Sequence, residues 1–411
     1  MSIKNTQKNS TFNNKSGFNR KFIKKVNTTL NDLLSYSKDE DYKGYNKYDA
    51  LQSKFLSILS FNNKYLRLVY SQVVMRSPIN IRPILGIPKT KNPKGLALFA
   101  MAHLNKYRAY QKKENLQQAV ELIEWLIKNP SENYKGICWG YQHPWQDVGF
   151  FAPANLPNRV VTYFVLSAIM ELYEITKKQK YLDVTIDSVN FILNEPKVLF
   201  EDETKKCLSY VPDEAINWIV MDVSILCGSI LSRISKYNPD EFFNQQAKKL
   251  VNFVVDKQTD YGAWFYTFPQ GAHPRAHDNY HTGYILDAIL DYSRNSGDNS
   301  YMDNYFRGLD YYEKNLFLKN GAPKWANNRT YPLDVHGSAQ GIITFLKATE
   351  FDKKYYKIVE NITSWAINNM FNNKKRYFYY QKTRFFRKPF TLMRWSNGWM
   401  ARALSEIACR K

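Results

Sequence analysis

The stretch 277–284 reads His-Asp-Asn-Tyr-His-Thr-Gly-Tyr and runs directly into an apolar segment. In a helix, His277 and Asp278 lie four and three residues before His281, so the three side chains would project from one side of the first turn. A carboxylate and an imidazole held side by side can transfer protons. The alternative is that Asp278 only caps the helix and that backbone carbonyls bind the histidines.

A second pair of the same types follows at Asp334 and His336, again just before an apolar segment. The two pairs would be presented by adjacent parts of a repeating fold. We therefore expect Asp278 to act as general acid or base, with His281, His336 or Asp334 as its partner. Capping of a helix is an alternative role for Asp334 as well.

Five long loops combine tryptophan and tyrosine with amide, carboxylate, imidazole or guanidinium groups, whereas surface loops are usually polar. Aromatic planes flanked by hydrogen-bonding groups suit a carbohydrate, and basic side chains such as Arg159, Lys324 and Arg394 could hold an acidic one. Singly, Trp264 could cover the rim of the fold, and Asn158 and Arg159 could bind loop carbonyls. The substrate-binding residues expected from these loops and the following helices are Trp139, Tyr141, Trp145, Gln146, Asn158, Arg159, Asn217, Trp264, Tyr284, Lys324, Gln340, Arg394, Trp395 and Trp399.

Apolar residues at helical spacing predict the elements that must position these loops. The pattern alternates a strongly apolar helix with a more amphipathic one, and the apolar helices begin about every 55 to 65 residues, which is a period typical of repeated helical hairpins. The predicted pairs are Leu96–Tyr110 with Leu116–Ile127, Val160–Ile175 with Tyr181–Leu193, Ala215–Ile234 with Glu241–Val255, Thr282–Tyr292 with Tyr301–Asn315, and Ser338–Thr349 with Tyr355–Met370.

A last helix, Arg394–Cys409, would pair with a helix in Lys47–Met75 and complete six hairpins. The sequence therefore predicts an all-α (α/α)6 toroid, with the first helix of each pair inside. All inner helices would begin at one face of the ring, where their N–H groups carry positive partial charge. The loops before them would converge there.

The 411 residues carry a formal net charge of +21 and 16% aromatic residues. The basic balance favours an anionic partner. Residues 1–40 are expected to form a disordered basic tail and 41–411 a single toroid domain. The start of the sequence lacks the apolar core of a secretion signal, and no stretch is apolar enough for a transmembrane segment, so we expect a cytoplasmic protein.

The sequence does not indicate a cofactor. His277 and His281 have a metal-binding spacing, but the glutamate of the zinc-protease pattern is missing, so no metal site is expected. Phosphate-binding and dinucleotide-binding glycine motifs and the Gly-x-Ser-x-Gly motif are not found. We expect no cofactor, and the four scattered cysteines predict neither a zinc knuckle nor a disulfide framework.

Several blocks together resemble the six-hairpin glycosidase-like proteins encoded with bacterial and archaeal surface-polysaccharide genes. The blocks are Trp139-Gly140-Tyr141 with Trp145-Gln146, residues 157–162, Gln258 with 262–264, His281–Tyr284, and 332–336 with Ala339-Gln340. The resemblance covers roughly residues 75 to 410. It implies an (α/α)6 toroid that makes or trims an exopolysaccharide, capsule or O-antigen, and partner proteins of such a biosynthesis system are possible.

The reaction stays open at this stage. A glycoside hydrolase-like enzyme with Asp and His as acid and base is the first hypothesis, although hydrolysis normally uses two carboxylates and the paired glutamates of several toroid hydrolases are not found. A polysaccharide lyase or uronyl epimerase would instead remove a proton beside a carboxyl group. A non-catalytic glycan-binding protein of polysaccharide assembly is a further alternative.

Two other classes fit less well. The pattern Gln258-x-x-x-Gly262-x-Trp264 also resembles the repeat of terpene cyclases, but their Asp-rich motif does not occur in an inner-helix position. We expect no nucleic-acid partner, since the basic residues form no dense run beyond the tail.

Overall fold

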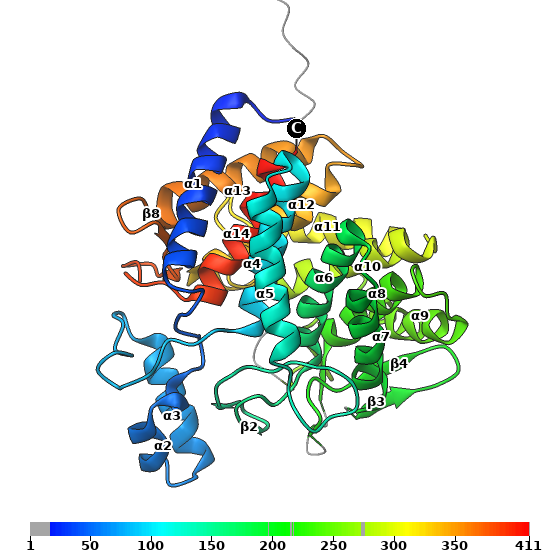
Figure 1. The fold of residues 1–411 in the computed structure, drawn as a ribbon, viewed down its shortest axis with the longest axis horizontal. Helices are drawn as coiled ribbons and strands as arrows, with labels where there is room; N and C mark the ends of the chain where they lie inside the picture. Colours follow the sequence, from blue (N-terminus) through cyan, green and yellow to red (C-terminus); the bar gives the residue numbers. More distant parts are fainter. Residues whose placement is uncertain (1–16, 196, 214–215, 217, 273–275, 411) are drawn as a thin grey trace, which may run out of the picture.

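Helices form a closed ring in the computed structural model, which describes residues 17–195, 197–213, 216, 218–272 and 276–410 (Figure 1). Each inner helix packs against the next, and the last packs against the first. The expected (α/α)6 toroid is therefore confirmed. The inner helices are α4 (Pro93–Tyr110), α6 (Arg159–Thr176), α8 (Met221–Ser235), α10 (Asn279–Ser296), α12 (Val335–Ala348) and α14 (Trp399–Ala408).

Outer helices cover the ring, one against each inner helix. They bury only one face, whereas the inner helices are buried along most of their length, as a two-layer ring requires. In the order of their inner partners, from α4 to α14, they are α5 (Lys113–Lys128), α7 (Gln179–Asn194), α9 (Glu241–Asp256), α11 (Met302–Leu316), α13 (Lys354–Met370) and α1 (Arg20–Asp39).

Helix α1 corrects two expectations. Residues 20–39 were expected within a disordered tail, but they form a regular helix that Asn19 caps and that buries Phe22, Val26, Leu30 and Leu33. This apolar stripe packs on α14, so α1 is the outer partner that we expected in Lys47–Met75. The basic residues between the apolar positions concealed the stripe. Residues 1–16 of the expected tail lie outside the described residues.

Asn and Asp side chains begin four of the inner helices. Asn92, Asn158, Asp278 and Asp334 each accept a hydrogen bond from an N–H in the first turn of α4, α6, α10 and α12. Helix α8 begins at Met221, later than the expected start at Ala215, which lies outside the described residues. A π-helical turn, Met393–Gly398, precedes α14 and includes the expected start at Arg394.

Short antiparallel strand pairs tie the loops together at the end of the ring where the inner helices begin. The pair β5–β6 joins the loop before α8 to the loop before α10, and β7–β10 joins the loops before α12 and α14. The strand pairs in the described ranges are β1 (Trp145–Gln146) with β2 (Phe151–Ala152), β3 (Val198–Glu201) with β4 (Lys206–Leu208), β5 (Ile219–Val220) with β6 (Thr267–Phe268), β7 (Leu333–Asp334) with β10 (Gln381–Lys382), and β8 (Phe371–Asn372) with β9 (Tyr377–Phe378).

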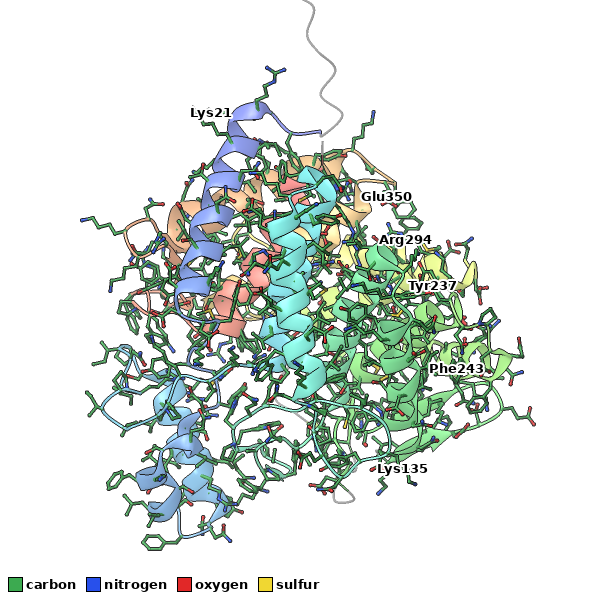
Figure 2. All side chains as sticks on the ribbon, viewed as in Figure 1. Lys21, Lys135, Tyr237, Phe243, Arg294 and Glu350 are labelled. Atoms are coloured by element: carbon green, nitrogen blue, oxygen red, sulfur yellow. The ribbon has the colours of Figure 1, made fainter. Side chains whose placement is uncertain are left out.

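Ion pairs link inner helices near their other ends. Glu171 of α6 lies 2.8 Å from Arg108 of α4 and 2.9 Å from Arg402 of α14. Further round the ring, Arg233 of α8 pairs with Glu174 of α6, and Lys347 of α12 pairs with Asp287 and Asp291 of α10. Paired charges therefore hold neighbouring inner helices together at this end of the ring. Figure 2 labels Arg294 and Glu350, which form an exposed ion pair on the ring.

One segment projects from the ring. It contains η1 (Ala50–Gln52), α2 (Lys54–Leu59) and α3 (Lys64–Arg76), has a small apolar core of its own, and stands below α1 in Figure 1. A buried ion pair between Arg82 and Asp49, at 2.8 Å, fastens the two ends of this segment together. Among the helices of the described ranges, none is both long and apolar enough to cross a membrane.

Candidate functional site

A cavity of about 860 Å³ opens at the face where the inner helices begin. Each inner helix, or the turn that starts it, contributes a lining residue: Lys94, Val160, Asp222, His281, His336 and Arg394. The loops add a wall of aromatic rings. The cavity therefore lies at the face where the loops were expected to converge.

His281 is held at this cavity by Asp278. The Nδ1 atom of His281 lies 2.6 Å from Oδ2 of Asp278, while Oδ1 of the same carboxylate accepts the backbone N–H of His281. Asp278 is thus both the helix cap and the partner of the imidazole. Its side chain is buried, and it is not among the described residues that line the cavity, whereas His281 is.

His336 lies in an aromatic stack. Its ring is 4.4 Å from that of Tyr280 and 4.4 Å from that of Trp399, on nearly parallel planes. Nε2 lies 2.8 Å from the hydroxyl of Tyr284, and Nδ1 has no hydrogen-bond partner among the described residues. Burial, together with Lys94, Arg394 and Lys47, holds the pKa of His336 well below its ordinary value, so this imidazole is neutral.

The two histidines are close to each other. The ring of Tyr280 lies 4.3 Å from that of His281 and 4.4 Å from that of His336. Tyr284 also contacts both rings. One residue of α12 and one of α10 therefore meet around two tyrosines at the base of the cavity.

Two ionisable lining residues at the starts of inner helices escaped the sequence reasoning. Lys94 is buried at the start of α4 and lies 3.5 Å from the hydroxyl of Tyr284, and burial, reinforced by Arg394, lowers its pKa well below the ordinary value. Asp222 is buried at the start of α8, and one of its carboxyl oxygens has no hydrogen-bond partner among the described residues. Lys94 and Asp222 each lie at the end of an apolar segment, and this position could have identified them from the sequence.

Burial raises the pKa of Asp222, although His281 and Lys94 act in the opposite direction. A carboxyl group with a raised pKa can keep its proton near neutral pH and donate it. Asp222 and Asp147 are the carboxylic acids among the described lining residues.

Basic side chains outnumber these acids. The lining cations are Lys47, Arg76, Lys94, Arg329, Lys388 and Arg394. The Lys47 ammonium lies 3.9 Å from the ring centre of Trp395, and the Arg394 guanidinium 4.8 Å from that of Tyr141. These contacts combine flat apolar surfaces with positive charge inside one cavity.

The structure brings eight of the expected residues to the cavity. They are His281 and His336 of the acid–base group, and Tyr141, Trp145, Gln146, Tyr284, Arg394 and Trp395 of the binding group. Trp399 lies directly behind them, stacked on both His336 and Tyr284. Asn217 lies outside the described residues.

Asp334 takes a position different from the one expected. It is buried, and its oxygens accept hydrogen bonds from the N–H of His336, from Nε2 of Gln381 and from Nε1 of Trp395. Burial raises the pKa of Asp334, and Lys47 and the hydrogen bonds oppose this. Asp334 caps α12 and fixes neighbouring side chains, and it does not line the cavity in the described structure.

Six expected binding residues have structural contacts away from the cavity. The indole N–H of Trp139 donates to Leu126 O and that of Trp264 to Val254 O, so each closes the end of an outer helix. The others hold nearby groups: Asn158 caps α6, Arg159 donates to Ile192 O and Ser209 O, Lys324 donates to Asn327 O, and Gln340 donates to Asp287 and Thr344.

His277 also has a structural explanation. Its Nδ1 lies 2.8 Å from Trp264 O, and its Nε2 lies 3.0 Å from the hydroxyl of Tyr261. Among the described residues, no three His, Cys, Asp or Glu side chains are grouped so that they could hold a metal ion.

Sequence comparisons find no matching family model and no matching curated protein. Solved structures do match. A cellobiose 2-epimerase from Bacillus thermoamylovorans B4167 has 16% identity and a TM-score of 0.65, covering 96% of this chain and 100% of its own. An unsaturated glucuronyl hydrolase specific for heparin has 10% identity and the same TM-score of 0.65, over 95% of this chain and 97% of its own.

A D-mannose isomerase has 13% identity and a TM-score of 0.58, over 77% of this chain and 86% of its own. Identities this low relate the proteins by fold. The chain has the (α/α)6 toroid fold that it shares with these structures, which include an epimerase, an isomerase and a hydrolase that act on sugars.

Proposed function

We propose that this protein is a carbohydrate-active enzyme that moves a proton at a carbon atom of a sugar, as an epimerase or isomerase does. The observation that carries this proposal is the pair of imidazoles at the cavity, His281 against Asp278 and His336 against Tyr284. The His281 ring has a carboxylate partner, whereas burial and nearby cations keep the His336 ring neutral, so the two imidazoles can take different parts in acid–base chemistry.

The pair suits removal and return of a proton. One imidazole takes the proton from a carbon next to a carbonyl group, and the other delivers a proton to the same or the neighbouring carbon. Asp278 holds Nδ1 of His281, which assigns proton exchange with the substrate to Nε2. Negative charge that develops on the sugar oxygen would be stabilised by Lys94 and Arg394. Asp278 then acts through His281 as a positioning residue.

The lining cations favour an anionic sugar. Six basic side chains face two acidic ones, and burial of the Arg394 guanidinium strengthens its attraction for a carboxylate or sulfate. Trp145, Trp325 and Trp395 offer flat surfaces on which sugar rings stack. An acidic surface polysaccharide, or its oligosaccharide precursor, is the substrate we propose on the basis of the family resemblance.

Deuterium exchange tests the proposal without knowledge of the net reaction. A panel of uronic-acid-containing disaccharides and neutral disaccharides is incubated with the protein in D2O, and NMR follows deuterium at each sugar carbon. We expect exchange at one carbon of an acidic sugar, with His281→Asn and His336→Asn slowing it at least about 100-fold. Equal exchange by these variants would refute the assignment.

Hydrolysis is the second candidate, because Asp222 is a buried carboxyl group with a raised pKa at the cavity. It could protonate a glycosidic oxygen while Asp147 or an imidazole activates water. In water labelled with 18O, a hydrolase places the label at the new reducing end, whereas an epimerase leaves the glycosidic bond intact. If a sugar binds saturably but takes up neither deuterium nor 18O, the result would favour a glycan-binding protein.

A further inference from the structure

Large apolar side chains are exposed on the segment that projects from the ring. Helix α2 and the following turn present Phe55, Ile58 and Phe61, of which Ile58 is 72% and Phe61 77% exposed. Helix α3 presents Tyr65, Val69 and Val73, which recur every fourth residue and so share one face. Exposed apolar side chains gathered on one projecting segment of a folded protein mark an interaction site.

The charge of this segment has one sign. Residues 50–92 contain seven Lys or Arg residues and neither Asp nor Glu. Some of these cations form ion pairs within the protein, as Arg82 does with Asp49. Lys54 and Lys64, in contrast, are exposed on the same segment as the apolar side chains. The surface therefore combines exposed apolar groups with cations only.

A second exposed loop has the same character. Residues 381–390 read Gln-Lys-Thr-Arg-Phe-Phe-Arg-Lys-Pro-Phe, again with no acidic residue. A tight turn, closed by the hydrogen bond from Thr383 N to Phe386 O at 2.8 Å, leaves Phe385 88% exposed beside the exposed Arg384. The ammonium of Lys388 donates to Met75 O near the end of α3, so the loop and α3 are neighbours.

Both parts border the cavity. Leu68, Gln72 and Arg76 line it from α3, and Gln381 and Thr383 line it from the loop. Whatever binds the exposed apolar face of α3 therefore lies next to the cavity wall.

We propose that α2, α3 and the loop 381–390 bind the surface of a lipid bilayer that contains anionic head groups. Aromatic and aliphatic side chains surrounded by Lys and Arg are the pattern of an interfacial, non-spanning membrane contact. The charge complementarity favours an anionic bilayer over an apolar protein surface, since no acidic residue of either segment opposes it. The proposal does not depend on the reaction that the cavity catalyses.

Vesicle co-sedimentation of the full chain tests it. One set of vesicles contains phosphatidylcholine alone, and the other contains about one third phosphatidylglycerol. We expect sedimentation with the anionic vesicles, weakened by Phe55→Ser with Phe61→Ser and separately by Phe385→Ser. Lys54→Gln and Lys64→Gln should each weaken binding about fivefold, the contribution typical of one cation near such a surface.

The control is Phe242→Ser, which removes an exposed phenylalanine from the outer helix α9 and should leave binding unchanged. All the substituted residues are exposed, so thermal unfolding should be unaffected. The basic residues at the start of the chain remain present in every variant. Binding that persists in all Phe variants, or absence of vesicle binding with self-association in light scattering, would overturn the proposal.

Discussion

Oδ2 of Asp278 lies 2.6 Å from Nδ1 of His281, within the first turn of α10. Oδ1 of Asp278 accepts a hydrogen bond from the backbone N–H of His281. One carboxylate thus fixes both the start of the helix and the ring of a cavity residue. The sequence presented capping and contact with a histidine as alternatives for Asp278, and the two oxygens of this side chain make both.

Replacing Asp278 by Asn tests the positioning role. The amide can still cap the helix but cannot stabilise a positive charge on the His281 ring, so we expect kcat on the sugar found active in the exchange assay to fall about 100-fold, with KM little changed. A rise in KM alone, or loss of the folded state by circular dichroism, would contradict this role.

Buried histidines predict a loss of stability in mild acid. Burial lowers the pKa of His103 to about 4 and that of His143 to about 3. Both groups then bind a proton in the unfolded chain, near pH 6.5, before they do so in the folded protein. Stability is therefore complete above about pH 6.5 and falls as the pH decreases toward 4, by about 2 kcal/mol for each histidine at pH 5.

Urea unfolding at pH 7.5 and pH 5 measures this difference. The variant His103→Gln should reduce the pH dependence between these values by about 2 kcal/mol, whatever its effect at pH 7.5. An unchanged pH dependence would show that His103 carries its proton in the folded protein.

Glu171 should be essential for stability and distant from catalysis. Burial alone would raise its pKa, but Arg402 and Arg108 lower it to about 2. Glu171→Gln leaves two guanidinium groups without their carboxylate and should cost about 3 kcal/mol. The exposed Arg294–Glu350 pair, 2.6 Å apart in the structure, provides the matched control.

In that control, Glu350→Gln should change the free energy of unfolding by less than about 0.5 kcal/mol, because exposed pairs contribute little. For Glu171, the stabilisation is present above the unfolded pKa near 4.5 and is lost as the pH falls toward 2. If denaturant titrations at pH 7 gave similar losses of unfolding free energy for Glu171→Gln and Glu350→Gln, the difference between the buried and the exposed ion pair would be refuted.

Helical periodicity was sufficient to predict the ring, because inner and outer helices differ in how much of their surface is apolar. The outer helix α1 was missed because lysines interrupt its stripe. The rule that inner helices begin at one face correctly located His281, His336 and Arg394 at the cavity. Lys94 and Asp222 obey the same rule, but neither has the neighbouring histidines that drew attention to His281.

Tryptophan was the less reliable indicator. Aromatic loops were expected to form the cleft, and Trp145 and Trp395 do line it. Trp139 and Trp264, which follow outer helices, use the indole N–H to bind the carbonyl groups that those helix ends leave without an intrahelical partner. Composition alone does not separate these two uses, since the helix end and the sugar both accept a hydrogen bond from the indole.

Substitutions of two tryptophans separate binding from stability. Trp264→Phe removes the hydrogen bond to Val254 O and should lower the free energy of unfolding by about 1 to 2 kcal/mol, with no effect on the affinity for the active sugar. Trp145→Ala removes a cavity wall and should raise KM about tenfold, as the loss of about 1.4 kcal/mol of binding energy does. Differential scanning fluorimetry and initial rates measure both effects on the same preparations. If Trp264→Phe changed KM while Trp145→Ala did not, the cavity at the loop end of the ring would not be the binding site.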